Sequence, residues 1–462
     1  MNKINKLKSF LETQGPTLAL VTILLIFLAY TGILAMNLQA AIIPDEPAHF
    51  IFSKHYSSTW GIPPDTYETY SWGWYIEGNP FLYYWINGRI INLINLISPG
   101  ITDFNLLISL RLVNVIYALG TVWFCFLLSN EVIQHRWWQL LPVFLLTNML
   151  MFVFISAGVQ YDNLANLLSI AGLYFLVRVI KHHNFAINSL AWMICLALGT
   201  LVKYPILPLA LAMSIAWLIF TIIHYKEIFP ISKIPVITIL LSVLLVPLII
   251  GNFAIYGMNF IKYQSITPPC SKILPESQCA LSRYKQRHEI MALEQKLSIE
   301  ESISKGYPSP LRYAFVDWVY HILLRSLGLI GHKSYFPLHL IPYYQLLFYI
   351  TVILGLLNIF LWRTFTDIEI NLLGITLFYT IVLLITNYNS ELVYGFKQIA
   401  VQGRYLFPII GAIVILFTTI MKKTPIRVIQ GVMLAFTIGL IFFGGPLSVL
   451  LNYDTILYDW FI

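Results

Sequence analysis

Charged residues are scarce in this chain. Aspartate, glutamate, lysine and arginine make up 11% of its 462 residues, whereas hydrophobic residues make up 58%. Soluble domains carry roughly a quarter charged residues, so this composition excludes water as the main solvent of the chain. The sequence therefore predicts a protein that is embedded in a lipid bilayer.

Apolar windows of roughly 14 to 23 residues, which suit helices that cross a bilayer, recur along the chain. They cover residues 16–36, 106–128, 140–155, 164–180, 187–202, 206–223, 234–253, 346–362, 372–385, 406–421 and 428–443. Backbone groups in hydrocarbon must be satisfied within the segment, and the alternating pattern of a barrel strand is missing. We expect an all-α membrane protein with about eleven transmembrane helices.

The basic residues indicate how the chain is oriented. The first window follows Lys3, Lys6 and Lys8, and its apolar run is longer than that of a signal peptide, so we expect an uncleaved anchor. Alternation from a cytoplasmic N-terminus then places the basic turns inside, in agreement with the positive-inside rule. These turns contain His135, Arg136, Arg178, Lys181, Lys226, Lys233, Arg363, Lys422, Lys423 and Arg427. The net charge of +7 is therefore largely topological, and no nucleic-acid partner is expected.

Cysteine is also rare, with four residues in the chain. Cys125 and Cys195 fall inside apolar windows without metal-binding spacing, which is typical of small buried hydrophobic residues. Cys270 and Cys279 lie in a long loop on the predicted outer side. An oxidising compartment would allow them to form a disulfide.

Two long loops divide the chain. We expect an N-terminal transmembrane module (1–256) that includes the first outer loop (38–105), a second outer loop (257–341), and C-terminal transmembrane helices (342–462). The first loop contains the amphipathic run 81–97, which is typical of an interfacial helix. In the second loop, 287–305 predicts an exposed helix and 314–329 an interfacial one. A twelfth span over 314–329 is the alternative.

The motif Pro44-Asp45-Glu46-Pro47-Ala48-His49-Phe50 directly follows the first window. Pro47 favours the first turn of a helix, which would place both carboxylates at the positive end of its dipole. Asp45 and His49 would share one face at i, i+4 spacing while Glu46 points elsewhere, so the two acids are expected to have different roles. The alternative is that Asp45 only caps the helix.

Asp162 lies in a very short outer turn before the window 164–180. It either caps the following helix or supplies a second acid at the level of Asp45. Two carboxylates that face one cavity suit a general base with a helper, or a cation site.

Two cations lie on the outer side, against the orientation bias. Lys203 occupies a turn between two windows, and Arg404 opens the window 406–421. Each of these two side chains either extends to the membrane interface or holds a lipid phosphate. Weaker candidates of the same kind are Arg325, Lys397 and Arg89. Because no nucleotide-binding glycine loop is present, a nucleotide-sugar donor is not expected.

At these residues the chain resembles a bacterial family of membrane proteins catalogued as domain of unknown function 2142, within the GT-C clan of lipid-linked-sugar glycosyltransferases. The resemblance rests on Pro44-Asp45-Glu46-Pro47-Ala48-His49-Phe50, Asn79-Pro80-Phe81-Leu82-Tyr83-Tyr84, Asp162 with Leu164 and Ala165, Lys203, Ser326-Leu327-Gly328 and Gln402-Gly403-Arg404-Tyr405-Leu406-Phe407-Pro408. The family pattern often has a second proline where this chain has Phe81.

The resemblance implies a GT-C-like fold in the bacterial inner membrane with a periplasmic active site. It also implies inverting sugar transfer from a polyprenyl-phosphate sugar to a glycan or lipid acceptor. Asp45 would be the catalytic base, with Glu46 and His49 beside it, while Lys203, Arg404 and Arg325 would hold the donor phosphate. No cofactor is required for this chemistry, although a Mg²⁺ or Mn²⁺ ion shared by Asp45 and Asp162 is an alternative.

Three other functions fit the composition. A transporter or flippase of lipid-linked sugars would also carry intramembrane charges, and it predicts paired discontinuous helices near the midplane. An O-antigen polymerase or ligase would use the same class of donor but transfer an oligosaccharide. A scaffold would bind a partner through its loops, whereas an enzyme predicts that Asp45, Asp162 and Arg404 come together. The sequence leaves the sugar, the acceptor and the oligomeric state open.

Overall fold

The computed structural model describes residues 12–71, 75–228, 235–279, 297–330, 334–396, 401–452 and 457–462. Within these residues, ten helices are long and apolar enough to cross a membrane, which establishes a multi-pass, all-α membrane protein. Their main segments are α2 (Gly15–Asn37), α6 (Asp103–Val132), α9 (Tyr161–Ile180), α10 (Phe185–Val202), α11 (Leu207–Ile223), α13 (Val236–Asn252), α21 (Ile341–Phe360), α22 (Asp367–Val393), α23 (Ile410–Lys423) and α24 (Arg427–Gly444). Lys3, Lys6, Lys8, Lys233, Lys397 and the first part of 287–305 lie outside the described residues.

The window 140–155 does not form the single helix that we expected. It forms α7 (Leu140–Thr147) and α8 (Leu150–Ser156), which are separated by Asn148 and an extended Met149. The Asn148 side-chain amide donates to the carbonyl of Phe144 at 2.8 Å, a local bond that competes with helix continuation. Every residue of α8 is buried, whereas Asn148 and Met149 at the break are only partly buried.

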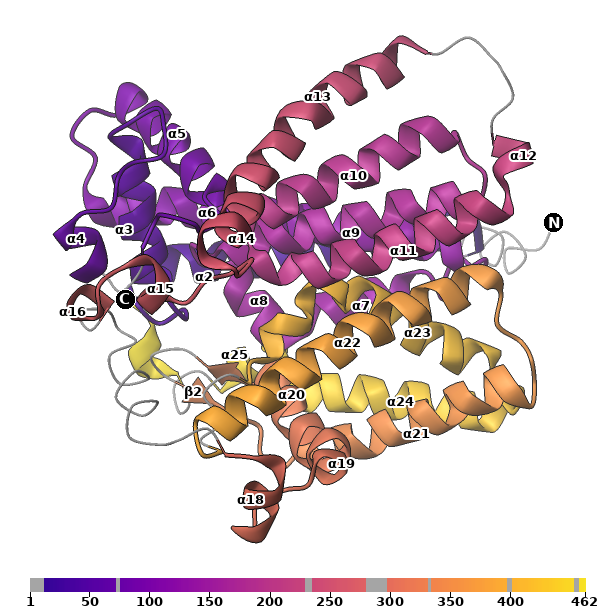
Figure 1. The fold of residues 1–462 in the computed structure, drawn as a ribbon. Coiled ribbons are helices and arrows are strands. Elements are labelled where there is room, and N and C mark those ends of the chain that lie inside the picture. Colours follow the sequence, from indigo (N-terminus) through magenta and orange to yellow (C-terminus); the bar gives the residue numbers. More distant parts are fainter. Residues whose placement is uncertain are drawn as a thin grey trace.

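Both long loops lie at the end of the bundle away from the N-terminus, which is the left end in Figure 1. The first loop forms α3 (Glu46–Ser57), α4 (Tyr67–Ser71) and α5 (Leu82–Ile97), and α5 occupies the predicted run 81–97. The C-terminus lies at the same end of the bundle (Figure 1).

The second loop is a series of short elements. It contains α14 (Met258–Tyr263), α15 (Cys270–Ile273), α16 (Glu276–Cys279), α18 (Ile299–Ser304), α19 (Pro310–Arg312), η3 (Tyr313–Asp317), α20 (Trp318–Leu327) and a hairpin of β1 (Leu329–Ile330) and β2 (Ser334–Tyr335). The segment 314–329 is largely helical and is not among the candidate spans. A disulfide joins Cys270 to Cys279 across a Cα–Cα distance of 5.8 Å. The division at 256 and 341 stays a prediction.

Helix α9 lies at the centre of the N-terminal half, between α6 and α10 (Figure 1). About 78% of its apolar window is buried inside the protein rather than facing lipid. The Cβ of an alanine at Gly411 in α23 would lie 3.1 Å from Ile170, so α23 also approaches α9 closely. This packing fixes the first turn of α9, where Asp162 lies, against elements from both halves of the chain.

Candidate active site

Four charged side chains from four elements meet at the loop-bearing end of the bundle. Arg404, in η4 (Gly403–Ile409), donates from Nη2 to Oδ2 of Asp45 at 2.7 Å. Its Nη1 lies 3.7 Å from Oδ2 of Asp162, whose Oδ1 accepts from the ammonium of Lys203. Asp45, Arg404, Asp162 and Lys203 thus form a row of alternating charge, which we call the ion chain.

Asp45, the first residue of the ion chain, has an unusual backbone conformation. It precedes α3 in the left-handed conformation, with φ of 57°, and its side chain makes no capping hydrogen bond. The predicted helix start at Glu46 and Pro47 is confirmed. Asp45 occupies the N-cap position of α3, but its carboxylate pairs with Arg404 instead of capping the helix.

Asp162 does not occupy the N-cap position of α9, which is that of Gln160. It lies within the first helical turn with its carboxylate buried against Lys203. Lys203 does not snorkel, because it is only 4% exposed. Its ammonium lies 4.6 Å from the ring centre of Tyr161 and 5.0 Å from that of Tyr405, so two aromatic faces help to stabilise the buried cation.

Accessibility decreases from Asp45 to Asp162 along the ion chain. The side chain of Asp45 is 41% exposed, that of Arg404 is 8% exposed, and that of Asp162 is 1% exposed. Two carboxylates and two cations give the ion chain no net charge. A ligand that approaches from solvent therefore meets Asp45 before Arg404.

Glu46 belongs to a separate, fully buried ion pair. Its two carboxylate oxygens accept from Nε and Nη2 of Arg111, in α6, at 2.8 and 2.6 Å. Our reading of the sequence missed Arg111, although an arginine inside an apolar span is itself a signal of function or pairing. Asp45 and Glu46 thus make different contacts, as the turn geometry predicted.

His49 lies behind the ion chain without exposure to solvent. Its Nδ1 is hydrogen-bonded to the Tyr84 hydroxyl at 2.8 Å, and its ring packs edge-on against Tyr161 at 4.5 Å. Burial lowers the pKa of His49 from 6.5 to about 3. The imidazole is therefore neutral at physiological pH and adds no charge to the site.

The weaker cation candidates have other contacts. Arg325, in α20, donates from Nη1 to the carbonyl of Val401 in the segment that leads to Arg404. It supports that segment, whereas its expected contact with a donor phosphate stays a prediction. Arg89, in α5, stacks 4.6 Å from the ring centre of Trp60 and donates to a carbonyl of the first loop. Arg89 thus organises the loop around α5.

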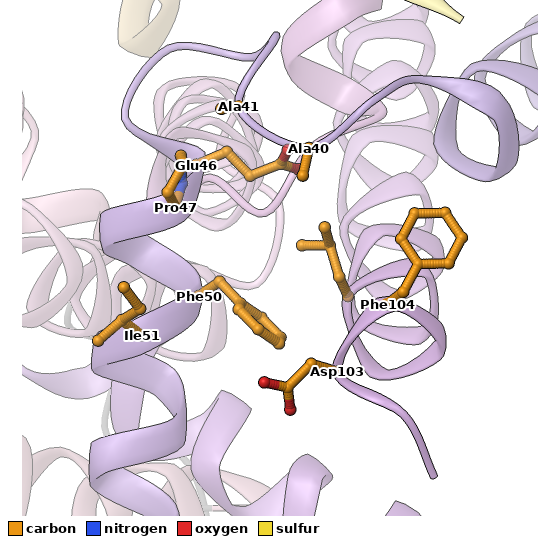
Figure 2. A pocket seen from close by; sticks show the side chains of 9 residues that line it. Ala40, Ala41, Glu46, Pro47, Phe50, Ile51, Asp103 and Phe104 are labelled. Carbon is orange, nitrogen blue, oxygen red and sulfur yellow. The ribbon is translucent and has the colours of Figure 1, made fainter. Parts of the chain in front are cut away.

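A pocket of about 260 Å³ opens between the start of α3 and the start of α6. Figure 2 shows Phe50 of α3 pointing toward the first turn of α6, where Asp103 lies. The atoms that line this pocket are apolar, although Glu46 and Asp103 contribute to it, and none of the four ion-chain residues lines it. In the part of the chain that the structure describes, no three His, Cys, Asp or Glu residues cluster as metal ligands. Cation use by Asp45 and Asp162 stays a prediction.

The fold of the whole chain is similar to that of solved structures. The structure of ArnT from Cupriavidus metallidurans bound to undecaprenyl phosphate superimposes with a TM-score of 0.50 and 12% identity, over 92% of this chain. The fold is of the GT-C type. This chain spans 63% of the length of that ArnT chain.

A second GT-C structure aligns less well. The oligosaccharyltransferase AglB from Archaeoglobus fulgidus, in complex with an inhibitory peptide and a dolichol-phosphate, gives a TM-score of 0.40 and 14% identity. The alignment covers 92% of this chain and 54% of that one. No family model matches the sequence, and no curated protein matches it significantly. At these identities the comparison establishes the fold, and the activity has to be argued from the site.

Proposed function

We propose that this protein is an inverting membrane glycosyltransferase that uses a polyprenyl-phosphate sugar as donor. The acceptor is a hydroxyl of a cell-envelope glycan or lipid on the periplasmic face of the bacterial inner membrane. The observation that carries the proposal is the ion chain, since it combines an accessible carboxylate with a buried guanidinium at one end of a GT-C fold. A base and a phosphate ligand side by side are what this transfer requires.

The reaction begins when the donor phosphate replaces the Asp45 carboxylate on Arg404. Asp45 then accepts the proton of the acceptor hydroxyl as that oxygen forms its bond to the anomeric carbon. The bond between the anomeric carbon and the phosphate oxygen breaks on the opposite face, and the polyprenyl phosphate leaves with the electron pair. Arg404 neutralises the departing phosphate directly, and Lys203 adds positive potential from behind Asp162.

The test compares the wild-type protein with Asp45→Asn and Asp103→Asn. Each is purified, checked for folding, and assayed for sugar release from a panel of polyprenyl-phosphate sugars in the presence of cell-envelope acceptors. Asp103 is the matched control, because it is an exposed carboxylate at the start of α6 that pairs with Lys54 on the surface. We expect Asp45→Asn to lose activity by orders of magnitude and Asp103→Asn to retain it.

Other outcomes would redirect the assignment. Equal transfer by wild type and Asp45→Asn would remove Asp45 from catalysis and favour Asp162 as the base. Release only from oligosaccharide donors would favour a polymerase or ligase. No transfer from any donor, combined with movement of labelled lipid-linked sugar across vesicles, would refute the enzyme in favour of a transporter.

A further inference from the structure

Among the residues that the structure describes, Arg111 is the largest side chain that is fully buried, and it lies within the otherwise uncharged window 106–128. A guanidinium has five N–H donors, and all five are engaged here. Besides the two bonds to Glu46, Nη1 donates to the carbonyls of Ala35 and Leu38 at 3.2 and 2.7 Å. Nη2 donates to the carbonyl of Gln39 at 3.1 Å.

These bonds join three separate parts of the chain around Asp45. Arg111 fixes the end of α2 through its carbonyls and the first turn of α3 through Glu46. Glu46 Oε1 also accepts from the backbone N–H of Val159 at 3.0 Å, in the turn before α9. The pair Arg111–Glu46, which we call the clamp, therefore connects α2, α3 and α6 to the turn that leads to Asp162.

The clamp acts on the residue next to it. Asp45 has a left-handed backbone, which is costly for a residue other than glycine and persists only where its surroundings impose it. On one side Asp45 is bounded by Glu46, whose carboxylate the clamp holds. On its other side, Asp45 is enclosed by a tight turn, which the Glu46 N–H closes by donating to the carbonyl of Ile43 at 3.3 Å.

We propose that Arg111 is a positioning residue for the transferase site: through Glu46 it holds Asp45 in the conformation that presents its carboxylate to Arg404. The catalytic part of this inference rests on the proposed function, whereas the geometric part does not. A misplacement of about 1 Å at a catalytic group can cost a factor of about 100 in rate. The clamp thus contributes to kcat without contacting either substrate.

The test uses the double variant Arg111→Met/Glu46→Leu, because removal of one partner alone leaves an uncompensated buried charge and endangers folding. The matched control is Lys54→Met/Asp103→Leu, which removes an ion pair that also joins α3 to the start of α6 but is exposed. Arg111→Lys is a third variant, since a lysine keeps the charge but cannot form the two-pronged contact.

The first readout is independent of activity. Asp45→Cys and Arg404→Cys are introduced together after Cys125 and Cys195 are replaced by alanine, and a short thiol cross-linker is applied to membranes. We expect cross-linking with the intact clamp and in the Lys54/Asp103 control, and a loss of about tenfold or more in the folded clamp variants. Equal cross-linking in all variants, or none with the clamp intact, would overturn the inference.

The second readout is sugar transfer by proteins that retain Asp45 and Arg404. We expect kcat to fall about 100-fold in the clamp double variant with an unchanged KM for the donor, and Arg111→Lys to recover part of it. A rise in KM with unchanged kcat would refute positioning of the base. If the wild type transfers nothing, the proposed function fails while cross-linking still decides the geometry.

Discussion

We predict that Lys203→Met destabilises the protein strongly, and that the additional substitution Asp162→Leu restores its stability. The Lys203 ammonium bonds Asp162, whose carboxylate is 1% exposed and otherwise faces Arg404 at 3.7 Å. Breaking a buried pair costs about 3–5 kcal/mol because a charge is left uncompensated, whereas apolar replacement of both partners is often neutral. In the double variant Lys203→Met/Asp162→Leu, Arg404 still has Asp45 as its ion-pair partner. We expect a coupling energy of at least about 2 kcal/mol.

The assay is denaturant unfolding of the detergent-solubilised protein, followed by tryptophan fluorescence, for the wild type, both single variants and the double. The same cycle at Lys54 and Asp103 is the control, since these side chains are 42% and 71% exposed. Exposed pairs couple by less than about 1 kcal/mol. If the Lys203–Asp162 coupling is equally small, Lys203 is not the structural partner of Asp162, and its ammonium would be available to an external phosphate.

Two further predictions concern residues beside the ion chain. The pKa of His49 is lowered to about 3 in the folded protein, so His49 takes up a proton on unfolding below about pH 6.5. The stability of the folded state is therefore unaffected by this residue above about pH 6.5. It falls by up to about 1.4 kcal/mol per pH unit as the pH is lowered toward about 3. His49→Gln should flatten the melting temperature between about pH 7.5 and 5, and parallel curves would contradict this. Gly158→Ala should destabilise by about 1–3 kcal/mol, because its Cβ would lie 2.6 Å from the Ile43 side chain. Gly32→Ala should not destabilise the protein, because its Cβ would have no atom within 4 Å. Equal melting temperatures for the two variants would refute the close packing of Gly158 against Ile43.

The parts of the site that depend on local rules could be predicted from the sequence. Pro47 fixes the start of α3, so the opposite directions of Asp45 and Glu46 follow from a single turn of backbone. The apolar windows located the spans because length and hydropathy are local properties too. The expectation that the charged candidates lie on the side of the long loops rests on the alternation of the spans, which is counted along the chain.

Pairing between distant segments could not be predicted in this way. Asp162 and Lys203 are 41 positions apart, and Asp45 and Arg404 are 359 apart, so their contacts depend on how the bundle packs. Arg111 was overlooked because the window around it was weighed by its average hydropathy. Asn148 was overlooked for the same reason, although an asparagine inside an apolar window can bond its own backbone and is a local signal of the break between α7 and α8.

The charge balance of the ion chain bears on which donor the proposed enzyme accepts. A polyprenyl monophosphate sugar is a phosphodiester with a single negative charge, equal to that of the Asp45 carboxylate it replaces on Arg404. The exchange leaves the number of charges around Arg404 unchanged and makes Asp45 available as a base only when donor is present. A pyrophosphate-linked donor brings a second negative charge, which needs a further cation such as a divalent ion. For the proposed enzyme, the ion chain by itself therefore favours a monophosphate carrier over a pyrophosphate carrier.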